Sequence, residues 1–161
     1  MATPEELKDK FWKALHAQRT LMLGLEGVQE GHMRPMTAVF EEQDTPLWFF
    51  TSVDNALVGA QAEHGRALAT FAAKGHDLFA TVHGQLTQEH DRGVVDRFWS
   101  PFVAAWYEGK DDPKLAVLRL DPERAQIWLN DGGLFTGAAI LLGGDPRKAY
   151  AGKVAQVSMD R

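Results

Sequence analysis

Apolar residues near the start of the chain recur at the spacing of an amphipathic helix. Thr3 precedes Pro4, and Glu6 follows at the third helical position, which is the pattern of a capping box with proline in the first turn. Residues on one helical face lie three or four positions apart. The pattern therefore predicts a helix over residues 4–18 that buries one stripe of side chains. The residues of this stripe are Leu7, Phe11 and Leu15.

Most of the remaining chain is typical of short strands. Apolar and β-branched runs alternate with clusters of turn residues. Residues 74–77 are expected to form a hairpin turn in which Gly75 supplies a positive φ. Residues 121–123 are expected to separate two strands. The predicted strands are 20–26, 33–41, 47–51, 66–73, 78–88, 115–120, 124–129 and 153–159.

Two further stretches have helical spacing. Residues 54–63 predict a short helix that stops at Gly65, and residues 91–107 predict a helical stretch that Pro101 interrupts. Many strands and few helices favour an antiparallel β-barrel with flanking helices, since closure removes exposed sheet edges. We expect a mainly β single domain over residues 1–161.

Composition limits the partners of the chain. Its 17 basic residues are outnumbered by 22 acidic ones, and the net charge of -5 gives no general attraction to nucleic acid or anionic lipid. The apolar stretch 138–142 is far shorter than the roughly 20 residues that span a membrane. The N-terminus lacks the basic start and apolar run of a secretory signal. We therefore expect neither a nucleic-acid nor a membrane partner.

Cysteine and histidine narrow the chemistry further. The sequence has no cysteine, which excludes disulfides, thiolate nucleophiles and cysteine-based metal sites and is compatible with the cytoplasm, where we expect the protein. Its six histidines show no pair at ligand spacing, so a metal site is not expected. No glycine-rich phosphate loop and no Ser-His-Asp set is identifiable.

Two strand segments resemble a known family. Residues 31–38 read GHMRPMTA and residues 47–52 read LWFFTS. They resemble, in residues and spacing, the strands with which flavin-binding split-barrel proteins related to pyridoxamine 5'-phosphate oxidase meet their cofactor. The general stress protein 26-like group of that family is resembled by FWSP at 98–101, WY at 106–107, GKDDP at 109–113, the strand at 115–120, and Trp128.

The resemblance covers nearly the whole chain and implies both fold and function. It implies a six-stranded antiparallel FMN-binding split barrel, and a homodimer with two FMN sites at the interface, each drawing residues from both chains. The activity it implies is that of an FMN-dependent oxidoreductase acting on an unknown small molecule. The alternative is a non-catalytic flavin-binding or stress protein that has lost tight FMN binding. The C-terminus, VSMDR, lacks the basic signature of the pyridoxamine phosphate oxidases themselves.

The resemblance also names candidate site residues. Arg34 is expected to hold the FMN phosphate bidentately, although an exposed strand arginine is the alternative. Phe50 rather than Phe49 is expected to face the site, since neighbours in a strand face opposite ways. For Thr37, Trp106 and Trp128, the alternative is a structural role in packing. No catalytic residue is identified. The cofactor-binding candidates are Arg34, Pro35, Met36, Thr37, Phe50, Thr51, Ser52, Trp106 and Trp128.

One segment departs from the family pattern. Relatives carry lysine, or arginine and lysine, soon after the position of Thr51, whereas residues 54–57 here read DNAL. A lost charge-assisted contact costs about 1.5–3 kcal/mol, or roughly tenfold to a hundredfold in affinity. Arg66 and Lys74 are candidate substitutes, and the start of the helix near Asn55 offers backbone N–H groups as a third, although Asp54 would oppose an anion. If Leu57 stands where relatives grip phosphate, Leu57→Lys tightens FMN; if Leu57 packs a helix on the barrel, the lysine lowers stability.

Overall fold

The computed structural model describes residues 2–28, 33–63, 65–130, 141–143 and 153–160. Part of the segment 31–38, Gly31 and His32, lies outside these ranges, as does most of the stretch 138–142. In chain order the elements are α1 (Pro4–Gln18), β1 (Thr20–Leu25), β2 (Arg34–Thr37), β3 (Leu47–Ser52), α2 (Ala56–Ala60), β4 (Arg66–Ala72), β5 (Leu78–Glu89), α3 (Arg92–Phe98), α4 (Pro101–Ala104), β6 (Leu115–Leu129) and β7 (Val154–Ser158).

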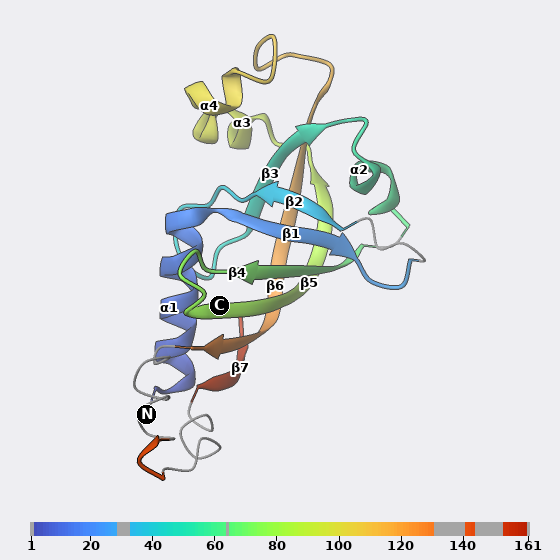
Figure 1. Cartoon of the computed structure of the whole chain (residues 1–161). Helices are drawn as coiled ribbons and strands as arrows, with labels where there is room; N and C mark the ends of the chain where they lie inside the picture. The colour runs from blue at the N-terminus through green and yellow to red at the C-terminus, as the bar shows by residue number, and fades with distance from the viewer. Residues whose placement is uncertain (1, 29–32, 64, 131–140, 144–152, 161) are drawn as a thin grey trace.

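Helix α1 confirms the predicted capping box and apolar stripe. The backbone N–H of Glu6 donates to the Thr3 hydroxyl at 3.2 Å, and the Glu6 carboxylate accepts from the Thr3 N–H at 2.8 Å. The three stripe residues are buried, and the helix runs along one side of the sheet against β5, β6 and β7 (Figure 1). The ammonium group of Lys8, also buried, lies 2.8 Å from the Asp44 carboxylate. One end of the core is therefore covered by α1.

The strands form one antiparallel sheet in the order β2-β1-β4-β5-β6-β3, and β7 pairs with β6 beside this path. The predicted mainly β split-barrel fold with flanking helices is confirmed. Two details differ from the prediction: the described sheet has β7 as a seventh strand beside the expected six, and its hydrogen-bonded path is not closed. Among the described residues, its end strands meet at one isolated bridge between Val39 and Trp48, with N–H to O distances of 2.8 and 2.9 Å. The wall between β2 and β3 is therefore open on either side of that bridge.

Two local predictions need correction. The two strands expected around residues 121–123 are one continuous strand, β6, which stays paired with β5 across a register shift between His83 and Gly84. Gly84 permits the close approach, since a Cβ there would overlap the Asp121 carbonyl. In the turn at 74–77, the positive φ is carried by His76 at 54°, not by Gly75.

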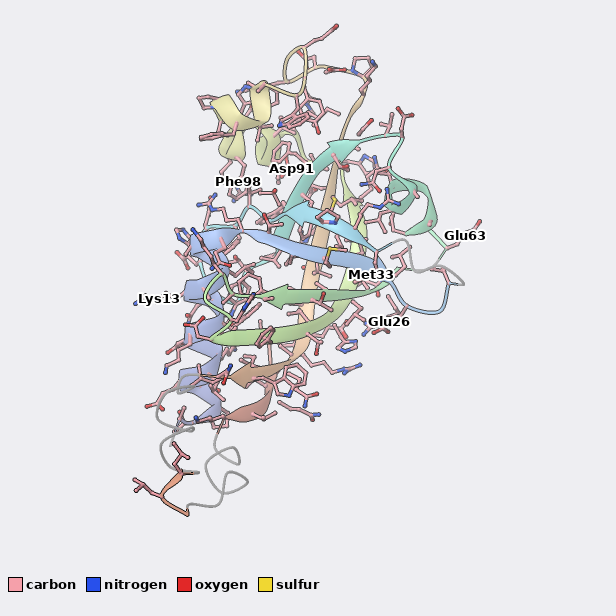
Figure 2. All side chains as sticks on the ribbon, in the orientation of Figure 1. Lys13, Glu26, Met33, Glu63, Asp91 and Phe98 are labelled. Carbon is pink, nitrogen blue, oxygen red and sulfur yellow. The ribbon has the colours of Figure 1, made fainter. Side chains whose placement is uncertain are left out.

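The apolar core is divided between two clusters. The larger one fills the inside of the sheet and includes side chains from α1, α2 and the strands. The smaller one consists of Trp48, Val94, Val95 and Val117, with Phe98 packed against it. Figure 2 shows Phe98 on α3 at the end of the sheet, where its ring centroid lies 5.3 Å from that of Trp48. This second cluster seats α3 on β3 and β6.

The positions of the helices decide where ligands have access. Helices α3 and α4 lie together above β3 in the view of Figure 1. Helix α2 lies on the opposite side from α1, near the start of β2. Across the described ranges, no helix has both the length and the apolar character that crossing a bilayer requires.

Candidate functional site

A pocket of about 540 Å³ opens where β2 and β3 face the helical end of the molecule. Its volume falls in the range of roughly 300–1,000 Å³ that is usual for small-molecule sites. The sequence candidates at 34–37 and 50–52 all line it, and so does Trp106. The full lining is Arg34, Pro35, Met36, Thr37, Val39, Phe50, Thr51, Ser52, Asn55, Phe102, Val103, Trp106 and Tyr107.

Strand β2 contributes a cation beside apolar surface. It pairs with β1 so that Arg34 lies opposite Leu23 and Met36 lies opposite Leu21. Met36 is buried, whereas Arg34 is half-buried. Of the described lining residues, Arg34 alone has a charged side chain, and none is a carboxylate. An anion in this pocket therefore meets one guanidinium and, among the described lining residues, no opposing charge.

Strand β3 contributes an aromatic ring and two hydroxyl groups. Phe49 is fully buried in the larger core cluster, while Phe50 is partly exposed and lines the pocket. This placement agrees with the choice of Phe50 over Phe49. Thr51 and Ser52 also reach the pocket although they alternate in direction. They do so because the strand ends here, with a turn directly after Ser52.

The sequence predicted backbone N–H donors near Asn55 but missed the contacts of its side chain. Its side-chain Nδ2 donates to Thr51 Oγ1 at 2.9 Å and contacts Met36 Sδ at 3.7 Å. Its Oδ1 accepts from the backbone N–H of Leu57 at 3.0 Å, which caps α2. The sequence signal was present, since asparagine before a short helix is a favoured N-cap. The contacts with two strands were not readable from it.

The opposite wall is aromatic and protrudes into solvent. Ser100 caps α4 by accepting from the Val103 N–H at 3.3 Å, and this short helix presents Phe102 and, after its end, Trp106. Phe102 is 86% exposed and Trp106 is 83% exposed, yet both line the pocket. Neighbouring exposed apolar side chains beside a pocket are typical of a ligand or partner site.

The segment after α4 is tied to α3 by ion pairs. Arg92 contacts Asp111, and the Lys110 ammonium lies 3.0 Å from Asp96. This attachment holds the chain around Tyr107, which lines the pocket. Burial, and then the charge of Asp112, raises the pKa of the Tyr107 phenol. Tyr107 therefore stays neutral at physiological pH and keeps a hydroxyl that can donate.

Trp128 lies elsewhere. It faces a separate hollow of about 450 Å³ on the outer face of β1, β4, β5 and β6, and its cross-strand neighbour is Phe79. Within one chain the structure does not bring Trp128 to the pocket that Arg34 lines. A Trp128 contact with the same ligand requires a second chain.

The structure shows where residues 54–57 lie, the segment that lacks the basic residues of the family pattern. Leu57 is fully buried in the core, so the hypothesis that a lysine at this position would face phosphate is wrong. Ala56, next to the lining residue Asn55, is exposed. The proposed substitute Arg66 lies outside the pocket and holds Glu123 through bonds of 2.7 and 2.8 Å. Lys74 also lies outside the lining.

The donor set of the pocket fits FMN. One guanidinium, several hydroxyls and an amide suit phosphate and ribityl oxygens, and the side chains of Met36, Phe50 and Trp106 suit a flat apolar ring. Over the same described ranges, no group of three or more histidine or acidic side chains is arranged to hold a metal ion.

Comparisons with known proteins identify the family and support the fold. A family model described as "Pyridoxamine 5'-phosphate oxidase like" matches residues 6–143. A general stress family protein from Xanthomonas campestris pv. campestris is 59% identical, with a TM-score of 0.77 over 84% of this chain and 94% of that chain. The general stress FMN/FAD binding protein from Xanthomonas citri is 56% identical, with a TM-score of 0.76 over 81% of this chain and 94% of that chain.

More distant relatives extend the match. A general stress protein 26 from Jannaschia sp. CCS1 is 28% identical, with a TM-score of 0.77 over 97% of this chain and 99% of that chain. General stress protein 26 of Bacillus subtilis (strain 168) is 34% identical over 51 residues, which are 32% of this chain and 36% of that protein. The chain thus matches about a third of that curated relative. These findings confirm the resemblance read from residues 31–38 and 47–52.

Proposed function

The chain belongs to the pyridoxamine 5'-phosphate oxidase-like family, and from this membership and the lining of the pocket we propose that it binds FMN between β2, β3 and α4. The proposed activity is that of a flavin-dependent oxidoreductase acting on a small molecule. The observation that carries the proposal is the gathering of Arg34, Thr51 and Phe50 on one pocket. The FMN/FAD binding named for the Xanthomonas citri relative supports it. A cytoplasmic location stays a prediction.

We assign the phosphate to the end of the pocket that holds Arg34. A guanidinium pairs bidentately with phosphate, and hydroxyl groups add donors. Thr51 and Ser52 supply such hydroxyls at the end of β3. The absence of a carboxylate from the described lining supports this assignment, since no like charge opposes the phosphate.

We assign the isoalloxazine to the apolar part of the lining. Met36, Phe50 and Trp106 offer apolar and aromatic surface to a flat ring. The backbone of residues 34–37, beside them, is the segment expected to meet the edge of the ring. When bound, FMN supplies the redox chemistry, and the protein supplies binding, orientation and electrostatics. Tyr107 is neutral at physiological pH, since burial raises its pKa further above the ordinary value, and it is available to donate a hydrogen bond to a ligand oxygen.

We further propose a homodimer that completes the site. Met22 and Phe79 are partly exposed on the outer sheet face, and both line the hollow that contains Trp128. A second chain covering this face would bury apolar surface and bring Trp128 toward a flavin held by its partner. Light scattering at micromolar concentration tests this, and a monomer there overturns the two-chain site.

A non-catalytic flavin-binding or stress protein is the second candidate. The observation that favours it is the lack of a basic residue at Ala56, the exposed position beside the pocket residue Asn55. The visible absorption spectrum of the purified protein, with released flavin identified by chromatography, distinguishes weak from tight binding. A tightly held flavin that is reduced and reoxidised by small-molecule donors and acceptors supports the oxidoreductase.

The binding site itself is tested with Arg34→Ala. We expect FMN to bind at least about tenfold more weakly, because a charge-assisted contact is lost. Riboflavin, which lacks the phosphate, should lose little affinity. Arg124→Ala removes an exposed strand arginine outside the pocket and is the matched control. Equal losses for FMN and riboflavin, or an effect of Arg124→Ala as large as that of Arg34→Ala, would remove the phosphate assignment.

A further inference from the structure

The amide of Asn55 has one orientation that satisfies its contacts. The backbone N–H of Leu57 can only donate, so the atom that it meets at 3.0 Å must be the acceptor Oδ1. The other end of the amide is then the NH₂ group, which faces Thr51 Oγ1 at 2.9 Å and Met36 Sδ at 3.7 Å. The start of α2 therefore fixes which end of Asn55 reaches the two strands.

This orientation decides the role of the Thr51 hydroxyl. The Asn55 NH₂ group only donates, so Thr51 Oγ1 accepts from it. A hydroxyl has one hydrogen, and within the described ranges no acceptor for the hydrogen of Thr51 is found. Thr51 lines the pocket with Arg34. Its hydrogen is therefore left for an acceptor in the pocket.

We propose that Asn55 is a positioning residue that holds the Thr51 hydroxyl as a donor and so selects a ligand with an acceptor oxygen, such as a phosphate, at this end of the pocket. The inference rests on the proposed FMN site and deepens it. Without Asn55, the Thr51 hydroxyl is free to rotate, and part of its donation to the ligand is lost. Asn55 thereby links the cap of α2 to ligand choice.

The experiment is a double-mutant cycle on FMN and riboflavin affinity, measured by calorimetry or flavin fluorescence. Asn55→Ser keeps a good helix cap but is too short to reach Thr51. Thr51→Val removes the hydroxyl and keeps the shape. We expect each single variant to weaken FMN about three- to tenfold, the double variant to be no weaker than Thr51→Val, and riboflavin to change little. Thr51→Ser, which keeps the hydroxyl, should retain FMN affinity.

The matched control is Asp91→Ser, which changes a similar cap on α3. Asp91 accepts from the Gly93 N–H at 2.8 Å and lies outside the pocket lining. Its variant should leave FMN affinity unchanged, and melting temperatures of all variants report any loss of folding. Asn55→Asp is the second test, because its carboxylate keeps the cap but accepts the Thr51 hydrogen, which also weakens FMN.

The possible results distinguish failure of the proposed FMN site from failure of the role given to Asn55. If the wild-type protein does not bind FMN, the proposed function fails and this inference fails with it. If the wild type binds FMN and the effects of Asn55→Ser and Thr51→Val add, Asn55 does not act through Thr51 and only the inference fails. Equal losses for FMN and riboflavin would likewise overturn selection for phosphate.

Discussion

The indole N–H of Trp48 on β3 donates a hydrogen bond of 3.1 Å to the Glu89 carboxylate at the end of β5. These strands flank β6, so the bond spans the central strand of the three. The guanidinium of Arg97 lies over the Trp48 ring, 5.2 Å from its centroid. Trp48 therefore joins the sheet to α3, the helix to which the wall of the candidate pocket is tied.

Glu89 should make stability depend on pH. Burial raises the pKa of its carboxyl, but the hydrogen bonds from the Asp91 N–H and from Trp48, with the charge of Arg119, outweigh burial, and the pKa is lowered overall. A lowered folded-state pKa stabilises the fold above the ordinary glutamate pKa, and this contribution is lost as the pH falls through the folded-state value. We expect Glu89→Gln to lower the unfolding free energy by about 1–2 kcal/mol at pH 7.

Urea unfolding at a series of pH values checks this expectation. The difference between wild type and Glu89→Gln should shrink as the pH falls below the ordinary glutamate pKa. Glu63→Gln, at an exposed side chain that points away from the molecule (Figure 2), should show no such dependence. A difference that is constant over the whole pH range would contradict the role given to the Glu89 charge.

Gly84 should tolerate no side chain. A Cβ there would overlap the Asp121 carbonyl and lie 3.0 Å from the Pro122 Cα, both backbone groups that cannot move aside cheaply. We expect Gly84→Ala to destabilise the protein by about 2–4 kcal/mol. Gly59→Ala, where a Cβ meets nothing within 4 Å, is the control. Thermal and urea unfolding measure both variants, and equal stabilities would show that the backbone at the His83–Gly84 register shift relaxes.

The close approach of Gly84 to Asp121 also explains why the sequence did not predict β6 as one continuous strand. The capping box of Thr3 and Glu6 depends on near neighbours, so the sequence predicted α1 with its observed ends. The continuity of β6 depends on Gly84 in another strand, and nothing local to Asp121 and Pro122 reveals it. Local turn residues therefore predicted a break that the neighbouring strand removes.

The residues of the candidate site were likewise predicted from the sequence only where they stand close together in the chain. Arg34 and the end of β3 were found through motifs that are continuous in sequence. The role of Asn55 required knowing that three elements converge on one amide. The burial of Leu57 depends on which side of a helix of five residues faces the core, a choice that so short a periodic pattern does not fix.

Trp106 should contribute to ligand binding and little to stability. Its side chain is 83% exposed and lines the pocket, so truncation removes no core packing. We expect Trp106→Ala to weaken flavin binding by about three- to tenfold and to leave the melting temperature within about 2 °C of wild type. FMN titration and thermal melting check this. Phe79→Ala, on the face that a second chain is proposed to cover, should weaken flavin binding only through loss of the dimer, so light scattering of this variant separates the two effects.

The last prediction compares Ala56 and Leu57, the two positions at which basic residues of the family pattern are missing. Ala56 is exposed beside Asn55, whereas Leu57 is fully buried. A lysine at position 56 can reach toward the phosphate end of the pocket without entering the core, so Ala56→Lys should tighten FMN about threefold to tenfold and riboflavin hardly at all. The Coulomb energy between two unit charges at about 4 Å is roughly 4 kcal/mol at an effective dielectric of 20, and desolvation and side-chain ordering offset most of it.

Leu57→Lys should instead destabilise the fold by more than about 3 kcal/mol, because it places an unpaired charge among core side chains. Calorimetric titration of both ligands and urea unfolding of both variants decide the matter. If Leu57→Lys folds stably and tightens FMN while Ala56→Lys does not, the register of residues 54–58 is the reverse of the one described.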